Sequence, residues 1–146
     1  MAHTIKRAAV VKAFRARLLL ARPDDGSDTL AERLRGGLHI GSPPDNADYQ
    51  YGAMRGENLQ RRNIDGPFFR LEVLLDLFHR PRSEAEALRE TTDTAVAVAV
   101  GWCDLAVGIS NVEVLDSDEV PPFSESKDPE VIRTRTRFAL DLHPAP

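Results

Sequence analysis

The chain has 146 residues, of which 42% are hydrophobic and 29% charged, so it can bury a core and is expected to form one domain over residues 1–146. Its net charge of −4 makes it a poor candidate for binding nucleic acid with its whole surface. Lysines and arginines interrupt the apolar N-terminus, and no apolar run approaches about 18 residues, so neither a signal peptide nor a transmembrane helix is expected. The single cysteine, Cys103, excludes an intrachain disulfide framework and fits a reducing compartment.

Two helices are predicted at the start of the chain. Residues 4–21 carry apolar side chains at spacings of three and four, which predicts an amphipathic helix with Thr4 as its N-cap. Its basic face fits a solvated surface helix, with a membrane or nucleic acid as the alternative partner. A short helix is predicted over residues 28–35, capped by Ser27 and stopped by the glycine pair at 36–37.

A short strand and a long polar stretch follow. Residues 38–40 have the composition of a strand, whereas residues 42–63 contain prolines, glycines and few large apolar side chains, which predicts a loop. Tyr49, Tyr51 and Met54 lie in this stretch and are residue types common at protein–protein contacts. We predict that they contact a partner, with a mobile loop as the alternative.

The strongest strand signal is FFRLEVLLDLFH at residues 68–79, because side chains alternate between the two faces of a strand. One face is fully apolar: Phe69, Leu71, Val73, Leu75 and Leu77. The other mixes charged and apolar residues: Phe68, Arg70, Glu72, Leu74, Asp76 and Phe78. The pattern predicts a long antiparallel strand with its apolar face on the core.

A helix is predicted next, because Ser83 and Glu86 have the spacing of a capping box and apolar residues continue at helical spacing to Trp102. The alternation of residues 94–100 also suits a strand, but the good cap favours a helix. We then predict a strand over residues 109–115, an acidic loop over 116–130, and a closing amphipathic strand over 131–143.

This order of elements predicts an α+β fold with a single largely antiparallel sheet and helices packed on one face. The closing strand places Arg133, Arg135 and Arg137 in a row on one side. Three like charges at this spacing need acidic neighbours. Glu72 and Asp76 within the chain, the acidic loop, or a neighbouring subunit are the candidates.

No constellation predicts an enzyme, a metal site or a cofactor. The histidines form no pair at metal-ligand spacing, and the motifs of phosphate-binding loops, dinucleotide-binding folds and nucleophile elbows are missing. Cys103 is predicted to be a buried helix residue. The acidic residues around Asp116 and Asp118 are predicted to form a solvated loop, with a Ca²⁺ or Mg²⁺ site as the alternative.

Three segments resemble the lambda-type siphophage tail terminator family: the basic N-terminal helix MAHTIKRAAVVKAF, the strand–loop–helix unit FFRLEVLLDLFHRPRSEAEALRE, and the closing strand IRTRTRFALDLH. Together they cover about half of the chain. The resemblance is one of order and pattern and brings no catalytic signature. The stretches at 42–63 and 116–130 are where this chain differs most from the pattern of that family.

The resemblance implies a structural virion protein that forms a homo-hexameric ring in the neck, at the head-proximal end of the tail. Such a ring, assembled in the host cytoplasm, would bind the tail tube protein, end tail polymerisation and join the head-completion or connector protein. Phage DNA would pass through its lumen without specific binding.

The predicted contact residues with other subunits or partners are Arg70, Glu72, Asp76, Arg133, Arg135, Arg137, Tyr49, Tyr51 and Met54. The mixed face of residues 68–79 is predicted to be covered only on assembly. The alternatives are a head-completion or stopper protein on the portal side, a small divalent-metal-dependent enzyme that uses the acidic loop, and a host-side binding module.

Overall fold

The computed structural model describes residues 5–20, 28–43, 48, 50–61, 68–80, 85–120 and 131–143. Its helices are α1 (Arg7–Leu20), α2 (Leu30–Arg33) and α3 (Ala85–Ala99). Its strands are β1 (Leu38–Ile40), β2 (Tyr51–Arg61), β3 (Phe69–His79), β4 (Ile109–Val120) and β5 (Ile132–Leu142). The predicted cap residues Thr4, Ser27 and Ser83 lie outside the described residues.

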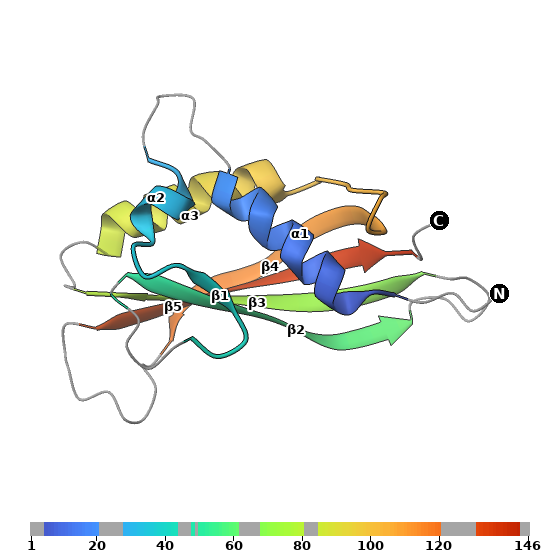
Figure 1. Ribbon diagram of the computed structural model, residues 1–146, viewed down its shortest axis with the longest axis horizontal. Coiled ribbons are helices and arrows are strands. Elements are labelled where there is room, and N and C mark those ends of the chain that lie inside the picture. The colour runs from blue at the N-terminus through green and yellow to red at the C-terminus, as the bar shows by residue number, and fades with distance from the viewer. Residues whose placement is uncertain are drawn as a thin grey trace.

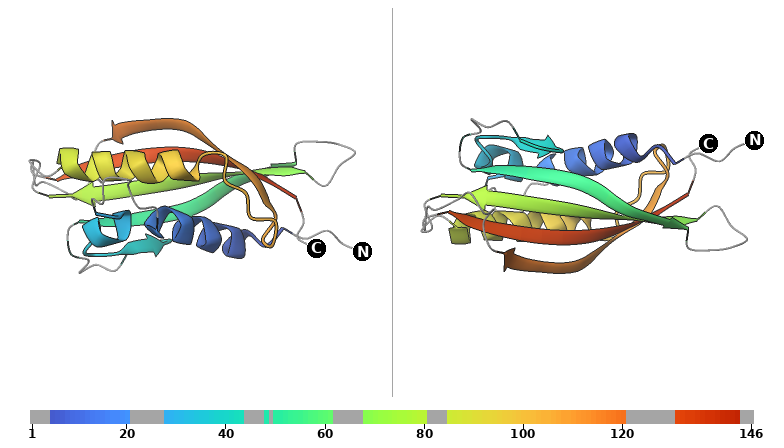
Figure 2. Two further views of the ribbon diagram at one scale, coloured as in Figure 1. Left: turned by 90° about the horizontal axis from the view of Figure 1, so that it is seen from above. Right: turned by 90° about the horizontal axis from the view of Figure 1, so that it is seen from below.

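The strands form one five-stranded sheet in the order β1-β2-β3-β5-β4. Every neighbouring pair is antiparallel except β1 and β2, which run parallel. Within the described ranges, the three helices lie on one face of the sheet and no helix covers the other face (Figures 1 and 2). The predicted α+β fold with a largely antiparallel sheet is therefore confirmed.

The core lies between the helices and the sheet. Leu71, Val73, Leu75 and Leu77 of β3 are at most 2% exposed and pack in one cluster with residues of α1 and α3. This confirms that the apolar face of β3 takes the helices. The ring of Phe14 in α1 meets that of Phe138 in β5 edge to face, with centroids 4.8 Å apart. Edge-to-face contacts are a preferred geometry for aromatic pairs, and this one ties the first helix to the last strand.

Strand β2 corrects the prediction of a loop over residues 42–63. Its residues pair with β3 over nearly their whole length, with one irregularity between Glu57 and Gln60. Gly52 and Gly56 occupy the core-facing positions opposite Leu77 and Val73, where a strand normally carries a large apolar residue. Because these positions are glycines, the alternation that identifies a strand is missing from the sequence.

The close packing over Gly52 predicts that Gly52→Ala destabilises the protein. A Cβ atom there would lie 2.7 Å from Leu77 Cδ2 and 2.8 Å from Leu38 Cδ1. Overpacking of this kind costs about 1–3 kcal/mol. Urea unfolding measures the loss, and Gly56→Ala is the matched comparison, because its new Cβ would lie farther from its nearest neighbours, at 3.2 Å, and should cost less. Equal stability of Gly52→Ala and the wild type would contradict this packing.

The helices differ from the predictions at their ends. Helix α3 is confirmed through Ala99, so residues 95–99 are helical and not a strand. Cys103 lies beyond the end of α3 and is exposed, which corrects its prediction as a buried helix residue. Helix α2 is only four residues long and is capped by Thr29, whose side chain forms a capping box with Glu32. None of the described helices is long and apolar enough to cross a membrane.

Candidate protein interaction surface

The open face is the side of the sheet opposite the helices (Figure 2). The strand register places most of the predicted contact residues on this face. The register places Leu74, Asp76 and Phe78 of β3 opposite Arg137, Arg135 and Arg133 of β5. On the other side of β5, Asp116 and Asp118 of β4 lie opposite Arg137 and Arg135. A central column of arginines is therefore flanked by carboxylates on both sides.

Asp76 is the centre of this arrangement. Arg135 donates from Nε to Oδ1 at 2.7 Å and from Nη2 to Oδ2 at 2.9 Å, which is a bidentate pair. Arg133 Nη2 also donates to Oδ2, at 2.8 Å. Burial raises the pKa of the Asp76 carboxyl, but the hydrogen bonds and charges of the two arginines outweigh burial and bring the pKa below its usual value. The hydrogen bond to Asp76 in turn raises the pKa of Arg135.

The other arginines of the open face also have carboxylate partners in the same chain. Arg137 lies 3.0 Å from Asp116 and 3.7 Å from Glu72. Arg70 lies 3.2 Å from Glu113 and 3.4 Å from the carboxylate of Asp141. We call this set of ion pairs the charge ladder; it consists of Arg70, Glu72, Asp76, Glu113, Asp116, Arg133, Arg135, Arg137 and Asp141. The sequence left open whether the arginine row pairs within the chain or with a neighbouring subunit. The structure shows a carboxylate partner within the chain for each of the three arginines.

Two of the three apolar residues of this face, Leu74 and Phe78, are already covered within the chain, which corrects the prediction that the mixed face is covered only on assembly. Leu74 is 4% exposed and Phe78 is 7% exposed. The Tyr51 ring stacks on Phe78 at 4.9 Å between centroids, and the Arg133 guanidinium lies 5.6 Å from the centre of the same ring. Phe68, by contrast, remains 48% exposed.

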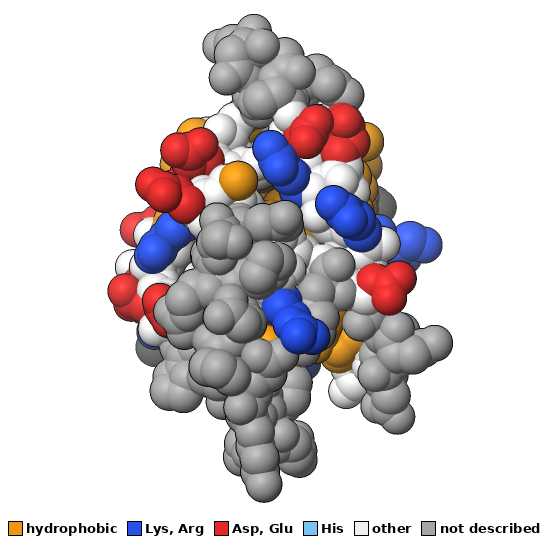
Figure 3. All heavy atoms as spheres, turned by 90° about the vertical axis from the view of Figure 1, so that its left-hand side faces the viewer, with side chains coloured by type: hydrophobic (Ala, Val, Ile, Leu, Met, Phe, Trp, Pro, Cys, Tyr) orange, Lys and Arg blue, Asp and Glu red, His pale blue; other side chains and the backbone are white. Residues whose placement is uncertain are grey.

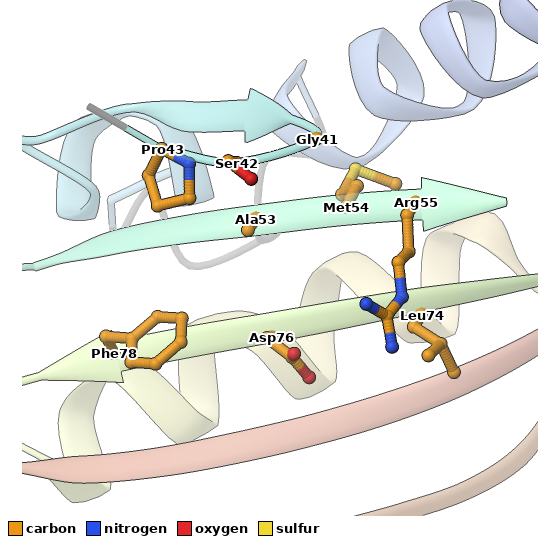
Figure 4. A pocket seen from close by; sticks show the side chains of 9 residues that line it. All are labelled: Gly41, Ser42, Pro43, Ala53, Met54, Arg55, Leu74, Asp76 and Phe78. Atoms are coloured by element: carbon orange, nitrogen blue, oxygen red, sulfur yellow. The ribbon is translucent and has the colours of Figure 1, made fainter. Parts of the chain in front are cut away.

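A small pocket opens beside the charge ladder between β2, β3 and the turn after β1 (Figure 4). Its volume is about 250 Å³. It is lined by Gly41, Ser42, Pro43, Ala53, Met54, Arg55, Leu74, Asp76 and Phe78. Pockets for small-molecule ligands typically measure about 300–1,000 Å³, so this one has room for a side chain of a partner rather than for a large ligand.

The predicted contact residues have different positions in the structure. Six of the nine belong to the charge ladder, and Tyr51 lies beside it on Phe78. Tyr49 lies outside the described residues. Met54 is 1% exposed and faces the helices opposite Leu75, in the apolar environment of the core; its contact with a partner stays a prediction.

The sequence did not reveal Glu113 as a partner of the arginines, and it offered Asp116 only as part of an acidic loop. Strand β4 continues to Val120, so residues 116–120 are part of the sheet and not of a loop, which corrects that boundary. A register shift between Val114 and Asp116 puts Glu113 and Asp116 on the same face although they are three residues apart. The available signal was the alternation of acidic residues at 116 and 118, at the same spacing of two as the arginines.

The side chains of the charge ladder are not grouped in a way that suits a metal site. Among the described side chains, no group of three histidine, cysteine or acidic residues is placed to hold one. Asp116, proposed above as a possible ligand, is instead paired with Arg137. Residues 121–130 of the acidic stretch lie outside the described part of the chain.

His79, at the end of β3, predicts a loss of stability at mildly acidic pH. Its side chain is buried, and neither ring nitrogen has a hydrogen-bond partner among the described residues. Burial lowers the pKa of His79, and the charge of Glu119 offsets only part of this effect. Below about pH 6.5, His79 therefore binds a proton more readily in the unfolded chain than in the native chain. The free energy of unfolding consequently falls as the pH falls.

The measurement is the free energy of unfolding between pH 7.5 and pH 5 for the wild type and for His79→Leu. The variant should show a flatter dependence over this range, because it removes the group that titrates differently in the two states. Parallel curves for the two proteins would show that His79 does not carry the effect.

Comparison with known proteins identifies a shared fold but no family. No protein-family model and no curated protein matches the chain. A solved structure described as "Virion of native gene transfer agent (GTA) particle" contains a similar chain, with a TM-score of 0.68 and 12% sequence identity. The match covers 96% of this chain and 99% of that chain. At this identity the two chains share a fold over nearly their whole lengths.

Proposed function

We propose that this protein is a structural subunit of a phage or phage-like virion that closes the head-proximal end of the tail tube. The observation that carries the proposal is the fold shared end to end with a chain of a gene transfer agent virion. The match extends over 96% of this chain and 99% of the other, so the likeness is not confined to one part of the fold. The segments that resemble siphophage tail terminators narrow this role from a virion subunit to the tail terminator.

The subunit is suited to a load-bearing, non-enzymatic role. Strands β2, β3, β5 and β4 are joined by long ladders, and the charge ladder ties three of these strands together from the open face. In the proposed role six copies form a ring in the neck, which binds the tail tube protein on one side and the head connector on the other. The ring assembles in the host cytoplasm and stays in the virion.

The proposed passage of DNA through the ring agrees with the way the arginines are used. Arg70, Arg133, Arg135 and Arg137 are each within 4 Å of a carboxylate of the same chain. Binding to the phosphate backbone requires cations that can replace its counterions. Because these four charges are neutralised internally, the open face would not hold DNA during its passage.

The direct experiment is to locate the protein in purified particles. Virions are collected from the strain that carries the gene, and an antibody or a small fused label is placed by electron microscopy. The label is expected at the junction of head and tail. Absence of the protein from washed virions would overturn the proposal.

Binding to isolated assembly intermediates separates the terminator from a stopper on the portal side. A terminator binds tail tubes that lack heads, whereas a stopper binds DNA-filled heads that lack tails. Sedimentation of the purified protein with each intermediate tests this choice. Binding to filled heads alone would leave a virion role but contradict the terminator.

A further inference from the structure

We infer that copies of this chain join head to tail, with β4 of one copy against the side formed by α1, β1 and β2 of the next. This inference rests on the proposed ring, because a ring requires two different and complementary patches on one subunit. The arginine row is not needed as one of these patches, since its charges are already paired with carboxylates within the chain. The complementary charges lie instead on the two sides of the sheet.

Strand β4 and helix α1, which lie on the two sides of the subunit, carry opposite charge. The twelve residues of β4 include four carboxylates and no lysine or arginine; the carboxylates are Glu113, Asp116, Asp118 and Glu119. The fourteen residues of α1 include four cationic side chains and no carboxylate; these are Arg7, Lys12, Arg15 and Arg17. Figure 2 shows β4 along one side of the molecule and α1, α2 and β1 along the other.

Charges remain available on both sides after the internal contacts are counted. On α1, Arg15 donates to Leu38 O and Arg17 to Val98 O, whereas Lys12 is exposed and has no ion pair with any residue in the described ranges. On β4, Asp116 pairs with Arg137, whereas Asp118 is exposed and is likewise unpaired within those ranges. At the end of the molecule shown in Figure 3, cations and carboxylates are interspersed. The separation of charge described for β4 and α1 does not extend to this end.

Both sides also present strand edges. β4 is the last strand of the sheet, and on the opposite side the pairing of β1 with β2 ends at Met54, although β2 continues to Arg61. Strand edges with unpaired backbone groups are a ready template for a further chain. Each edge carries one exposed large apolar residue, Leu115 on β4 at 37% and Ile40 on β1 at 49%.

The strand directions agree with such a contact. Because the pairs β2–β3, β3–β5 and β5–β4 are all antiparallel, β4 runs opposite to β1 and β2. Copies related by rotation about an axis along the strands would therefore present β4 to β2 in antiparallel orientation. This continues the pattern of the sheet from one subunit into the next.

Carbodiimide cross-linking of purified virions tests the contact directly, because it joins lysine amines only to carboxylates that touch them. The chain has three lysines, Lys6, Lys12 and Lys127, so the linked peptides are easily assigned. We expect denaturing gels to show a ladder of multiples of the 16.2 kDa chain, with Lys6 or Lys12 linked to the carboxylates of β4. Multimers linked without β4, or virions that hold the protein but yield no multimers, would overturn the inference.

Charge reversal provides a second test. Asp118→Lys or Lys12→Glu alone should weaken incorporation into virions by roughly tenfold, since each opposes like charges at every contact of the ring. The double variant Asp118→Lys/Lys12→Glu restores complementarity and should recover incorporation. Lys12→Arg keeps the charge, should incorporate normally, and should lose only the cross-link at position 12.

The two proposals fail in different ways. If the single reversals, checked for normal folding by circular dichroism, incorporate like the wild type, the protein is still a virion subunit but this contact is wrong. If the double variant fails to recover, charge complementarity between the two sides is likewise contradicted. If the wild-type protein is absent from virions, the proposed function itself fails.

Discussion

Phe138→Ala is expected to lower the free energy of unfolding by about 3–5 kcal/mol, the range for truncating a fully buried phenylalanine. Phe138 is 0% exposed and lies on β5 between the ladders to β3 and β4. Its ring meets Phe14 at 4.8 Å and an interplanar angle of 74°. The substitution therefore opens a cavity where α1 meets the sheet. Equilibrium unfolding in guanidinium chloride measures the loss.

The matched control for this prediction is Phe68→Ala. Phe68 is the same residue type but is 48% exposed, so its truncation should cost well under half as much. A double-mutant cycle with Phe14→Ala should show a coupling of about 0.5–1.5 kcal/mol between the two rings. Equal losses for Phe138→Ala and Phe68→Ala would contradict the position of the core.

Asp76→Ala is expected to cost about 2–4 kcal/mol, because it leaves Arg133 and Arg135 without their shared partner. The side chains of these three residues are 14%, 20% and 26% exposed, so solvent compensates for only part of the lost charge. The same method of unfolding at pH 7 measures the effect. Asp118→Ala is the control, since Asp118 is exposed and makes no ion pair with a described residue.

The pH dependence of Asp76 gives an independent check. Its pKa is lower in the native chain than in the unfolded chain, so its contribution is complete well above pH 3.8 and is lost as the pH falls through the native pKa. The difference in stability between wild type and Asp76→Ala should therefore shrink in strong acid. A difference that stays constant from pH 7 to pH 2 would show that the carboxylate charge is not responsible.

Much of the fold follows from local patterns in the sequence. Strand β3 keeps an alternation of apolar residues on its core-facing side, β5 keeps one in which Thr134 and Thr136 take two of the positions, and α3 keeps its helical spacing. These patterns arise because the side chains meet the core directly, so the period of the backbone appears in the sequence. The α+β fold and the packing of the apolar face of β3 on the core were predictable for this reason.

The parts that were missed depend on neighbours distant in the sequence. Gly52 has no side chain because Leu38 and Leu77 fill the space in front of it, and no local pattern contains that information. The irregularity between Val114 and Asp116 shifts the alternation of side chains along β4. Glu113 and Asp116 therefore lie on the same face although they are three residues apart. It was predictable that the arginine row needs acidic neighbours. That β4 supplies some of these carboxylates could be seen only once the register of the strands was known.

This use of the arginines changes where assembly contacts are expected. A row of exposed arginines would be an obvious surface for a partner, but here it stabilises the subunit. The carboxylates of β4 and the cations of α1 lie on opposite sides of the subunit, and the proposed ring would need two such complementary patches.

The most direct test of the proposed role is the length of tails made without this protein. Deleting its gene from the particle-producing strain should yield headless tubes of variable and excessive length, because nothing stops the addition of tube subunits. A plasmid copy of the wild-type gene should restore tails of uniform length joined to heads. Tails of normal length in the deletion strain, measured by electron microscopy, would contradict the account that this chain ends the tail.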